Sequence, residues 1–274
     1  NISFLFGQIM AKINMKRILI ILVVIAVIVA IPIRLSKKSN NVKSEVAENT
    51  VEQVLSENEN TSIENKENSE LEQKLQSGKT LSETGLPVLM YHFFYDKSKE
   101  TDKDGNWIEI SNFEEQMKYL AENDFYFPTW EQVENYIDGK QELPEKSVVI
   151  TVDDGDPSFF ELAVPIIQKY KIPTTSFVIT YWYGNRANDK QDYVSYQSHS
   201  YDMHKAGSNG KGVMLSWDYD KIKDDILLSR DVLGGANIFC YPFGQYNDLD
   251  IKVLKENGYR LAFTTKGGKV KKGS

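Results

Sequence analysis

The chain has 274 residues, a formal net charge of −7 at pH 7 and a single Cys. One Cys excludes both an intramolecular disulfide and a metal site built from cysteines. The negative charge, without a basic stripe along the chain, argues against a nucleic-acid partner, and we expect none. The aromatic content of 12% suits a packed core and also a carbohydrate-binding cleft.

The N-terminal part of the chain predicts a membrane segment. Residues 18–33 form an apolar run without charge, and a basic pair precedes them at 16–17. As a helix this run is about 24 Å long, slightly short of the ~30 Å hydrocarbon core of a bilayer. It is typical of either a signal anchor or a long signal peptide. Residues 28–30 offer a poor cleavage site, so we expect residues 15–35 to be an uncleaved signal anchor, a transmembrane helix.

The segments on either side of this anchor carry little sign of structure. Met15 resembles the true start of such an anchor, so we expect residues 1–14 to lie outside the native protein. Residues 36–85 are rich in Ser, Asn, Glu and Lys and have no aromatic residue. Such a segment buries too little apolar surface to offset its ordering entropy, which predicts a disordered polar linker. Anchor and linker predict a single-pass cell-membrane protein whose domain at 86–274 is extracellular, or a secreted protein if the N-terminal segment is cleaved.

From residue 86 onward, strand-like and helix-like segments alternate. Seven runs rich in apolar, β-branched or aromatic residues predict strands, at 87–92, 125–129, 147–153, 174–180, 194–199, 236–241 and 259–264. Amphipathic stretches between several of them predict helices, beginning near Ser111, Phe159, Tyr219 and Asp248. This alternation predicts an α/β fold with a parallel sheet covered by helices, open or closed. Seven strands fit a slightly incomplete, distorted (β/α)7 barrel, in which chemistry gathers at the C-terminal ends of the strands.

Polar side chains follow two of these predicted strands. Asp153 and Asp154 end one run, and His199 and His204 stand five positions apart after another. Adjacent carboxylates at the end of a buried strand must be paired or bound to a cation. One Asp and two His are a common ligand set for a catalytic Zn²⁺-like ion, and the second Asp is then free to act as a base. A turn that caps a helix and a pair of surface histidines are the simpler readings, and the combination favours a metal.

Three segments together resemble a known family. The sequence TVDDG at 151–155 resembles the first motif of the polysaccharide deacetylases, carbohydrate esterase family 4, also called the NodB-homology domain. The sequence HSYDMH at 199–204 resembles the second motif with one more intervening residue, a spacing similar to the poly-N-acetylglucosamine and intercellular-adhesin deacetylase branch. The sequence YPFGQYN at 241–247 resembles the third motif. The resemblance covers about residues 86–270, and it implies the family's barrel.

This resemblance implies a role for each residue of the cluster. Asp154, His199 and His204 would bind one divalent ion, with Zn²⁺ first and Co²⁺ or Ni²⁺ suited to the same ligands. Asp153 would be the general base that takes a proton from the water that the ion activates. The backbone N–H of Phe243 would stabilise the tetrahedral oxyanion together with the ion.

The proton donor to the leaving amine is expected to be His92. The family's usual acid is a late His in an L-x-H motif, but the corresponding residues 261–263 read Leu-Ala-Phe. In the adhesin-deacetylase branch an early Tyr-His supplies the acid, and Tyr91-His92 resembles that arrangement. A structural histidine at the barrel end is the alternative for His92. The Arg of the third motif falls at Cys240, so the charge that normally orients the base is absent or comes from elsewhere.

Further contacts with the substrate are expected from four residues, namely Phe243, Tyr241, Trp217 and Leu261. Trp217 follows the second motif soon along the chain and is expected to line the acetyl pocket. Trp107 and Trp182 also suit stacking on the C–H face of a pyranose ring. For each tryptophan, packing in the core or a loop is the alternative.

Together these residues predict a membrane-tethered extracellular hydrolase that removes N-acetyl groups from a polysaccharide. An N-acetylglucosamine polymer of a cell wall or biofilm is the expected substrate. Two alternatives stay open, an O-acetyl carbohydrate esterase and a catalytically degenerate member that only binds glycan. We expect a monomer with the acetylated polysaccharide and the membrane as its partners. Because the family usually continues for a few dozen residues, we expect the domain at 86–274 to be truncated at its C-terminus.

Overall fold

The structure, a computed structural model, describes residues 66–76, 78–81, 85–99, 103, 105–208 and 210–274. The expected extra start at 1–14, the anchor at 15–35 and the linker up to residue 65 lie outside the described residues. Within the described ranges, no helix is both long and apolar enough to cross a bilayer. Residues 66–76 form a helix, and its Leu71 is only 4% exposed. The compact unit therefore starts at residue 66, ahead of the domain boundary at 86.

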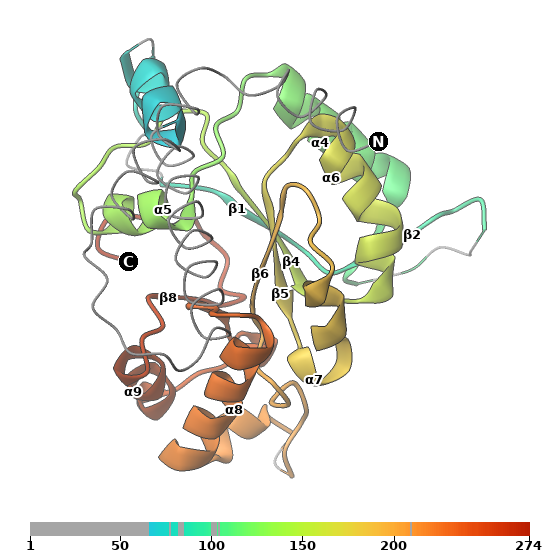
Figure 1. Ribbon diagram of the computed structural model, residues 1–274, viewed down its shortest axis with the longest axis vertical. Helices are drawn as coiled ribbons and strands as arrows, with labels where there is room; N and C mark the ends of the chain where they lie inside the picture. Colours follow the sequence, from blue (N-terminus) through green and yellow to red (C-terminus); the bar gives the residue numbers. More distant parts are fainter. Residues whose placement is uncertain (1–65, 77, 82–84, 100–102, 104, 209) are drawn as a thin grey trace, which may run out of the picture. The chain divides into compact units, whose positions relative to one another are not determined.

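A parallel sheet of six strands forms the centre of this unit (Figure 1). Its strands are β1 (Val88–Tyr91), β4 (Val149–Asp154), β5 (Thr174–Val178), β6 (Val194–Ser198), β7 (Ile238–Cys240) and β8 (Leu261–Phe263). Their order in space is β1-β4-β5-β6-β7-β8, which is also their order along the chain, and every neighbouring pair is parallel. The sheet curls into a half-barrel, and its C-terminal strand ends meet on one rim.

The expected seven-stranded barrel is corrected in two respects. The run at Phe125–Thr129 is not a strand of the sheet, since it makes only one isolated bridge, between Tyr126 and Ser147. Pro128 has no N–H to give to a ladder, and Thr129 caps the following helix, so the chain turns away from the sheet. The half-barrel also stays open, because β1 and β8 do not pair among the described residues.

A separate two-stranded sheet and one isolated bridge stand outside the main sheet. β2 (Phe93–Tyr95) and β3 (Trp107–Glu109) pair in parallel as a separate two-stranded sheet directly after β1. Leu86 and Val270 form an antiparallel bridge with two backbone hydrogen bonds of 2.8 and 2.9 Å. This bridge ties the segment before β1 to the segment after β8, although the two strands themselves remain apart.

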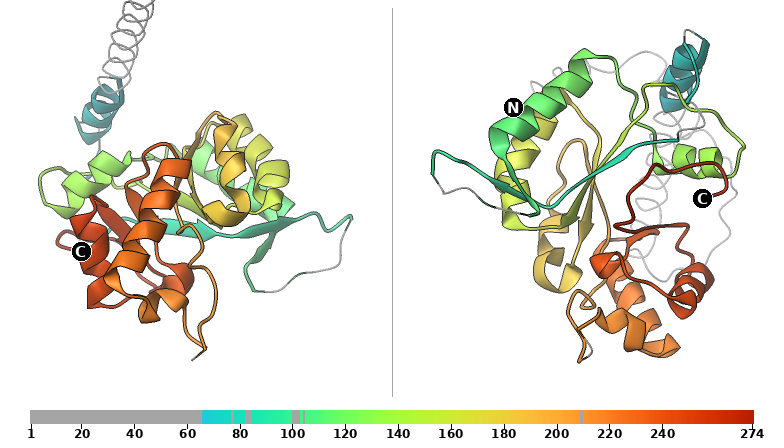
Figure 2. Two further views of the ribbon diagram at one scale, coloured as in Figure 1. Left: turned by 60° about the horizontal axis from the view of Figure 1, so that its bottom comes forward. Right: turned by 180° about the vertical axis from the view of Figure 1, so that it is seen from behind.

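Helices cover the sheet in two groups (Figures 1 and 2). They are α4 (Ile110–Glu122), α5 (Trp130–Ile137), α6 (Val164–Tyr170), α7 (Thr180–Tyr183), α8 (Tyr219–Val232) and α9 (Asp248–Glu256). Single turns complete the set, at η1 (Phe159–Ala163), η2 (Gly184–Asn188), η3 (Val213–Ser216) and η4 (Pro242–Gly244). Seen from behind in Figure 2, α4 and α6 lie together against one part of the sheet, and α8 and α9 lie together at the other.

Two apolar clusters hold these groups against the strands. One packs Phe113 and Met117 of α4 against Ile150 and Val152 of β4, and all four side chains are at most 1% exposed. The other packs α8 and α9 against Phe239 of β7. Burial of a side chain of this size contributes about 1.5–3 kcal/mol, so these contacts dominate the stability of the fold. They fix the strands whose C-terminal ends carry the polar residues of the site.

Candidate metal centre and active site

Three predicted metal ligands meet at one end of the sheet. Asp154 is the last residue of β4, His199 directly follows β6, and His204 stands in the loop beyond it. The Oδ1 atom of Asp154 lies 3.4 Å from Nε2 of His199 and 3.5 Å from Nε2 of His204. Their ligand atoms all lie within 4.8 Å of one another, so the three side chains converge on one point.

This arrangement fits a small divalent ion. Ligands about 2.1 Å from an ion in a tetrahedral site are about 3.4 Å from each other, which agrees with the Asp154–His199 distance of 3.4 Å. Oδ1 of Asp154 is buried and finds no hydrogen-bond partner among the described residues, as expected for an oxygen that faces a cation. Three protein ligands leave the fourth position of the ion for water, as catalytic sites require.

A backbone carbonyl sets the tautomer of His199. Its Nδ1 lies 2.8 Å from the carbonyl oxygen of Cys240, on the neighbouring strand β7. A carbonyl oxygen only accepts, so Nδ1 carries the proton and donates it there. Nε2 is then left with its lone pair toward Asp154, which is the state that a metal ligand needs.

The backbone at the site is held in the left-handed region. Asp154, Ser200 and Phe243 have φ angles of 72°, 71° and 60°, values that residues with a side chain rarely adopt. Such strain persists where the surrounding structure imposes it, and it is concentrated at functional sites. Gly155 next to them has φ +79°, and a Cβ there would lie 3.0 Å from a methyl group of Val178. The Asp-Asp-Gly sequence therefore forms a tight turn that packs closely against β5.

Asp153 is the buried carboxylate beside the ligand set. Its side chain points to the interior of the half-barrel, where Oδ1 has no hydrogen-bond partner within the described part of the chain. Oδ2 accepts a hydrogen bond from the thiol of Cys240 at 3.4 Å, and Nε2 of His92 lies 3.8 Å away. Burial raises the pKa of Asp153, although nearby His199 and His92 oppose the shift. Burial and the adjacent Asp153 raise the pKa of Cys240 well above its ordinary value.

Burial and the neighbouring charges together set the pKa values of the three ligand residues. Burial by itself raises the pKa of Asp154, but His199 and His204 beside it bring the pKa below its ordinary value. For His199, burial opposes the charged form, but the carboxylates of Asp154 and Asp153 beside it raise its pKa overall. Burial and the neighbouring His199 lower the pKa of His204. An imidazole that coordinates a metal is neutral, so a bound cation would replace the proton that makes His199 or His204 charged.

A cavity of about 600 Å³ opens between β1 and β8 and reaches Asp153 and Cys240. Leu261 lines it, so this predicted substrate residue shares a cavity with the buried carboxylate. Met90 and Phe177 also line it, and the sequence analysis missed both. Side chains alternate between the two faces of a strand, so the position of Met90 two residues before His92 was a usable signal.

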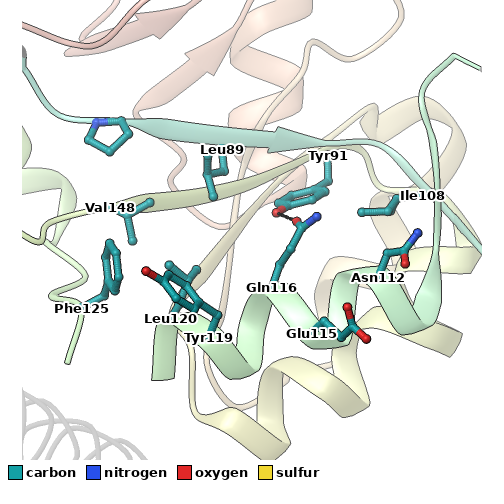
Figure 3. A pocket seen from close by; sticks show the side chains of 11 residues that line it. Leu89, Tyr91, Ile108, Asn112, Glu115, Gln116, Tyr119, Leu120, Phe125 and Val148 are labelled. Carbon is teal, nitrogen blue, oxygen red and sulfur yellow. Dashed lines mark hydrogen bonds between the residues drawn. The ribbon is translucent and has the colours of Figure 1, made fainter. Parts of the chain in front are cut away.

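The opposite face of β1 has a different environment (Figure 3). Leu89 and Tyr91 point there toward α4, and the Tyr91 hydroxyl donates to Oε1 of Gln116 at 2.6 Å. This hollow is lined mainly by apolar side chains and holds none of the predicted ligands. The alternation along β1 thus directs Met90 to the cavity with Asp153, and His92 follows on that side.

Aromatic rings surround His204. The Phe243 ring lies 4.3 Å from the His204 ring and the Trp182 ring 6.3 Å from it, centroid to centroid. Trp182 is 50% exposed and Phe243 is 42% exposed, so both offer a surface to a ligand. Tyr241 is buried and stacks on Tyr246 at 4.9 Å.

The other two tryptophans make contacts away from the ligands. Trp217 packs against the cluster under α8, and Nζ of Lys221 lies 3.9 Å from its ring centroid. Trp107 on β3 pairs with Phe93 on β2 at 5.0 Å. The place of Trp217 in an acetyl pocket stays a prediction.

Known proteins were compared with this chain. Residues 140–262 match the model of the family described as Polysaccharide deacetylase, and the match includes the Asp-Asp pair, both histidines of the ligand set and the turn at Phe243. This match identifies a polysaccharide deacetylase domain within the chain. The resemblance expected from the three motifs is thereby confirmed.

Two curated relatives of this chain come from staphylococci. The chain is 29% identical over 191 residues to the poly-β-1,6-N-acetyl-D-glucosamine N-deacetylase of Staphylococcus aureus (strain MRSA252), covering 63% of this chain and 65% of that protein. The protein of the same name from Staphylococcus epidermidis is 28% identical over 176 residues, covering 57% of this chain and 61% of that protein. The chain thus spans about 65% of the length of the first of these relatives.

Solved structures show the same fold. This chain is similar to IcaB from Ammonifex degensii, with a TM-score of 0.59 and 27% identity over 69% of this chain and 88% of that one. It also resembles the Streptococcus pyogenes deacetylase PplD, solved with acetate, with a TM-score of 0.58 and 24% identity over 70% of this chain and 86% of that one. The second likeness supports the fold alone.

Proposed function

We propose that this protein removes N-acetyl groups from an extracellular N-acetylglucosamine polymer by metal-dependent hydrolysis. The observation that carries the proposal is the convergence of Asp154 Oδ1 with the Nε2 atoms of His199 and His204, at 3.4 and 3.5 Å, beside the buried carboxylate of Asp153. The names of the staphylococcal relatives support this glycan as the substrate.

In this proposal Asp154, His199 and His204 hold one divalent ion, with Zn²⁺ preferred and Co²⁺ or Ni²⁺ possible on the same ligands. When bound, such an ion activates a water molecule and polarises the acetyl carbonyl. Asp153 would take a proton from the attacking water, because its Oδ1 has no other partner within the described residues. Burial raises the pKa of Asp153, which makes it a stronger base than an ordinary carboxylate.

His92 and Phe243 complete the proposed reaction. His92 gives a proton to the departing sugar amine, and its place 3.8 Å from Asp153 sets the acid and the base on neighbouring strands. The N–H of Phe243 would stabilise the oxyanion of the tetrahedral intermediate, and the position of this residue in a left-handed turn beside His204 supports that role.

Recognition of the glycan is assigned to the residues around these groups. The exposed Trp182 and Phe243 rings beside His204 offer flat apolar surfaces for a pyranose ring. Leu261 contributes to the cavity that reaches Asp153, and Tyr241 supports the rim through its stack on Tyr246. Trp217 remains our candidate for a more distant contact with the acetyl group.

The proposed place of the reaction follows from the sequence before the described residues. The apolar run at 18–33 and the polar residues that follow it up to residue 65 support a single-pass anchor with the catalytic domain outside the cell, or secretion after cleavage. We propose that the enzyme works there as a monomer. Alkaline extraction of membranes and sedimentation of the purified protein would test both statements.

Acetate release is the decisive test. The full chain, purified in detergent and loaded with Zn²⁺, would be assayed on poly-β-1,6-N-acetylglucosamine, chitooligosaccharides, peptidoglycan and acetylated xylan. We expect acetate from the first of these, loss of activity with a chelator, and loss of activity in His204→Ala. Preference for acetylated xylan would support an O-acetyl esterase instead, and no acetate from any polymer with Zn²⁺ bound would sink the enzymatic proposal.

A further inference from the structure

The segment that joins the two histidine ligands has no secondary structure of its own. Residues 199–204 leave β6 as a loop, and Ser200 within it has a left-handed φ of 71°. A loop has no regular ladder of hydrogen bonds to fix it. The positions of His199 and His204 therefore depend on the groups outside the loop that bind its backbone.

A buried carboxylate on α8 binds the middle of this loop. Oδ1 of Asp225 accepts the N–H of Tyr201 at 2.7 Å, and Oδ2 accepts the N–H of Asp202 at 2.8 Å. Asp225 is 7% exposed, so these bonds are shielded from water. Each of its oxygens is used for one of two successive peptide groups, and these groups lie between the two ligands.

The carbonyl groups of the same loop face α7. The carbonyl of Ser200 accepts the N–H of Thr180 at 3.2 Å, and that of Tyr201 accepts the N–H of Tyr181 at 3.0 Å. The loop is thus held from two sides, by donors at the start of α7 and by the acceptor on α8. The α7 donors are neutral peptide groups of a helix of one turn, whereas the acceptor on α8 is a carboxylate, which forms the stronger, charge-assisted hydrogen bonds.

The position of Asp225 on its helix is costly without such a role. Ile222, Asp225, Ile226 and Ser229 form the buried face of α8, where an apolar side chain would pack without loss. Burial raises the pKa of Asp225 to about 6, although the two N–H groups of the loop oppose this shift. A carboxylate at this place needs those two donors, and the donors hold the loop in return.

We propose that Asp225 is a positioning residue of the metal centre, whose carboxylate clamps the 199–204 loop so that both histidine Nε2 atoms converge on Asp154. The inference rests on the metal site of the proposed function. Asp225 acts through two peptide N–H groups rather than by contact with a ligand. Supports of this kind typically change metal affinity by 10- to 100-fold when they are removed.

Asp225→Asn removes one half of the clamp at nearly constant volume. The amide oxygen still accepts one N–H, but the amide NH₂ opposes the other. Asp250→Asn is a matched control, because Asp250 on α9 is also buried and also accepts a backbone N–H, that of Asn247 at 2.8 Å, but it does not bind the loop. The Zn²⁺ dissociation constant of each full-length variant would be measured by competition with a chromophoric chelator.

We expect the Zn²⁺ dissociation constant to rise about 10- to 100-fold in Asp225→Asn and to stay within about threefold of wild type in Asp250→Asn. Acetate release by Asp225→Asn should recover when free Zn²⁺ is raised, which a general loss of folding would not allow. Asp225→Glu, which keeps both oxygens, should bind Zn²⁺ more tightly than Asp225→Asn, and it serves if the Asn variant does not fold.

Three results would overturn the inference. They are wild-type affinity in folded Asp225→Asn, an equal loss of affinity in Asp250→Asn, and activity that excess Zn²⁺ does not restore. Failure of the wild-type protein to bind Zn²⁺ would overturn the metal site itself. Zn²⁺ binding without acetate release would overturn only the proposed reaction, and the affinity comparison would still decide the role of Asp225.

Discussion

Asp153 on β4 lies beside His92, which directly follows the neighbouring strand β1, and 3.8 Å separates Nε2 of His92 from Oδ2 of Asp153. The third partner at this point is the thiol of Cys240, which donates to Asp153 at 3.4 Å. A thiol is a weak and neutral donor, so it orients the carboxylate without the charge of a guanidinium. Burial then dominates, and the pKa of Asp153 is raised.

The acid role of His92 predicts a difference between two kinds of substrate. An amine leaves a tetrahedral intermediate only after it is protonated, whereas an alcohol leaves more readily. In His92→Gln we therefore expect kcat on an N-acetylated oligosaccharide to fall about 10²–10⁴-fold and kcat on an O-acetyl ester to fall less than about tenfold. Asp153→Asn is the control that should slow both reactions. Equal effects of His92→Gln on both substrates, with metal still bound, would contradict this role.

At the scale of elements, the turn after β7 sets the proposed oxyanion donor. Phe243 and Gly244 are both left-handed, with φ angles of 60° and 66°. A Cβ on Gly244 would lie 2.2 Å from Oγ1 and 2.6 Å from the backbone nitrogen of Thr265, in the segment that follows β8. The turn therefore fits closely against that segment, and only glycine leaves room for it.

Gly244→Ala tests this turn. We expect it to lower the free energy of unfolding by about 2–4 kcal/mol and kcat by more than about tenfold, because Thr265 or the turn must move. Gly139→Ala provides the comparison, since Gly139 also has a left-handed φ of 71° but nothing lies within 4 Å of its Cβ position. The free energy of unfolding of that variant should fall by only about 1 kcal/mol, and its kcat should not change. Urea unfolding and acetate release measure both, and equal losses in the two variants would disprove the clash.

The strands that carry the metal ligands could be predicted from the sequence, whereas the contacts between distant parts of the chain around the site could not. β4 is a short β-branched run that ends in Asp-Asp-Gly, and β6 is a shorter mixed run with Val194 and Tyr196 that ends before the first His, so local pattern was sufficient for both. The prediction of a strand at 125–129 was wrong, because Pro128 cannot donate a ladder hydrogen bond and Thr129 already caps the next helix. The nearness of His92 to Asp153 depends on β1 lying next to β4, and strand order is a long-range property.

The sequence around Asp225 contains a signal of its buried role. Asp225 occupies a position of the α8 stripe between Ile222 and Ile226 that the helical period reserves for apolar residues. A polar residue in such a stripe indicates a buried partner, but the sequence does not say which one. The partner is a loop backbone, which has no residue signature at all.

For the whole molecule, Asp250 links stability to pH. Burial raises its pKa to about 6 in the folded protein, above the ordinary value of 3.8. The folded state thus retains a proton that the unfolded state has released. The stabilisation of the folded state that results is complete below about pH 4 and is lost as pH rises through about 6. The change amounts to at most about 3 kcal/mol.

Asp250→Asn should remove this dependence. In urea unfolding with a chelator present, the wild-type protein should lose stability relative to the variant between pH 4 and pH 7.5. The Asn side chain keeps an oxygen for the N–H of Asn247 and carries no charge, so its stability does not follow this titration. Parallel pH profiles for the two proteins would contradict the assignment to Asp250.

The sheet is built in the order in which the ribosome makes it. β4 can pair with β1, and β5 with β4, while β7, β8 and the bridge of Leu86 to Val270 await synthesis. Asp154 therefore takes its place early, whereas the loop of His199 and His204 becomes fixed only when α8 arrives with Asp225. Pairings between distant parts of a chain form slowly, so we expect cation uptake to be a late event of biosynthesis and a sensitive reporter of a nearly finished fold.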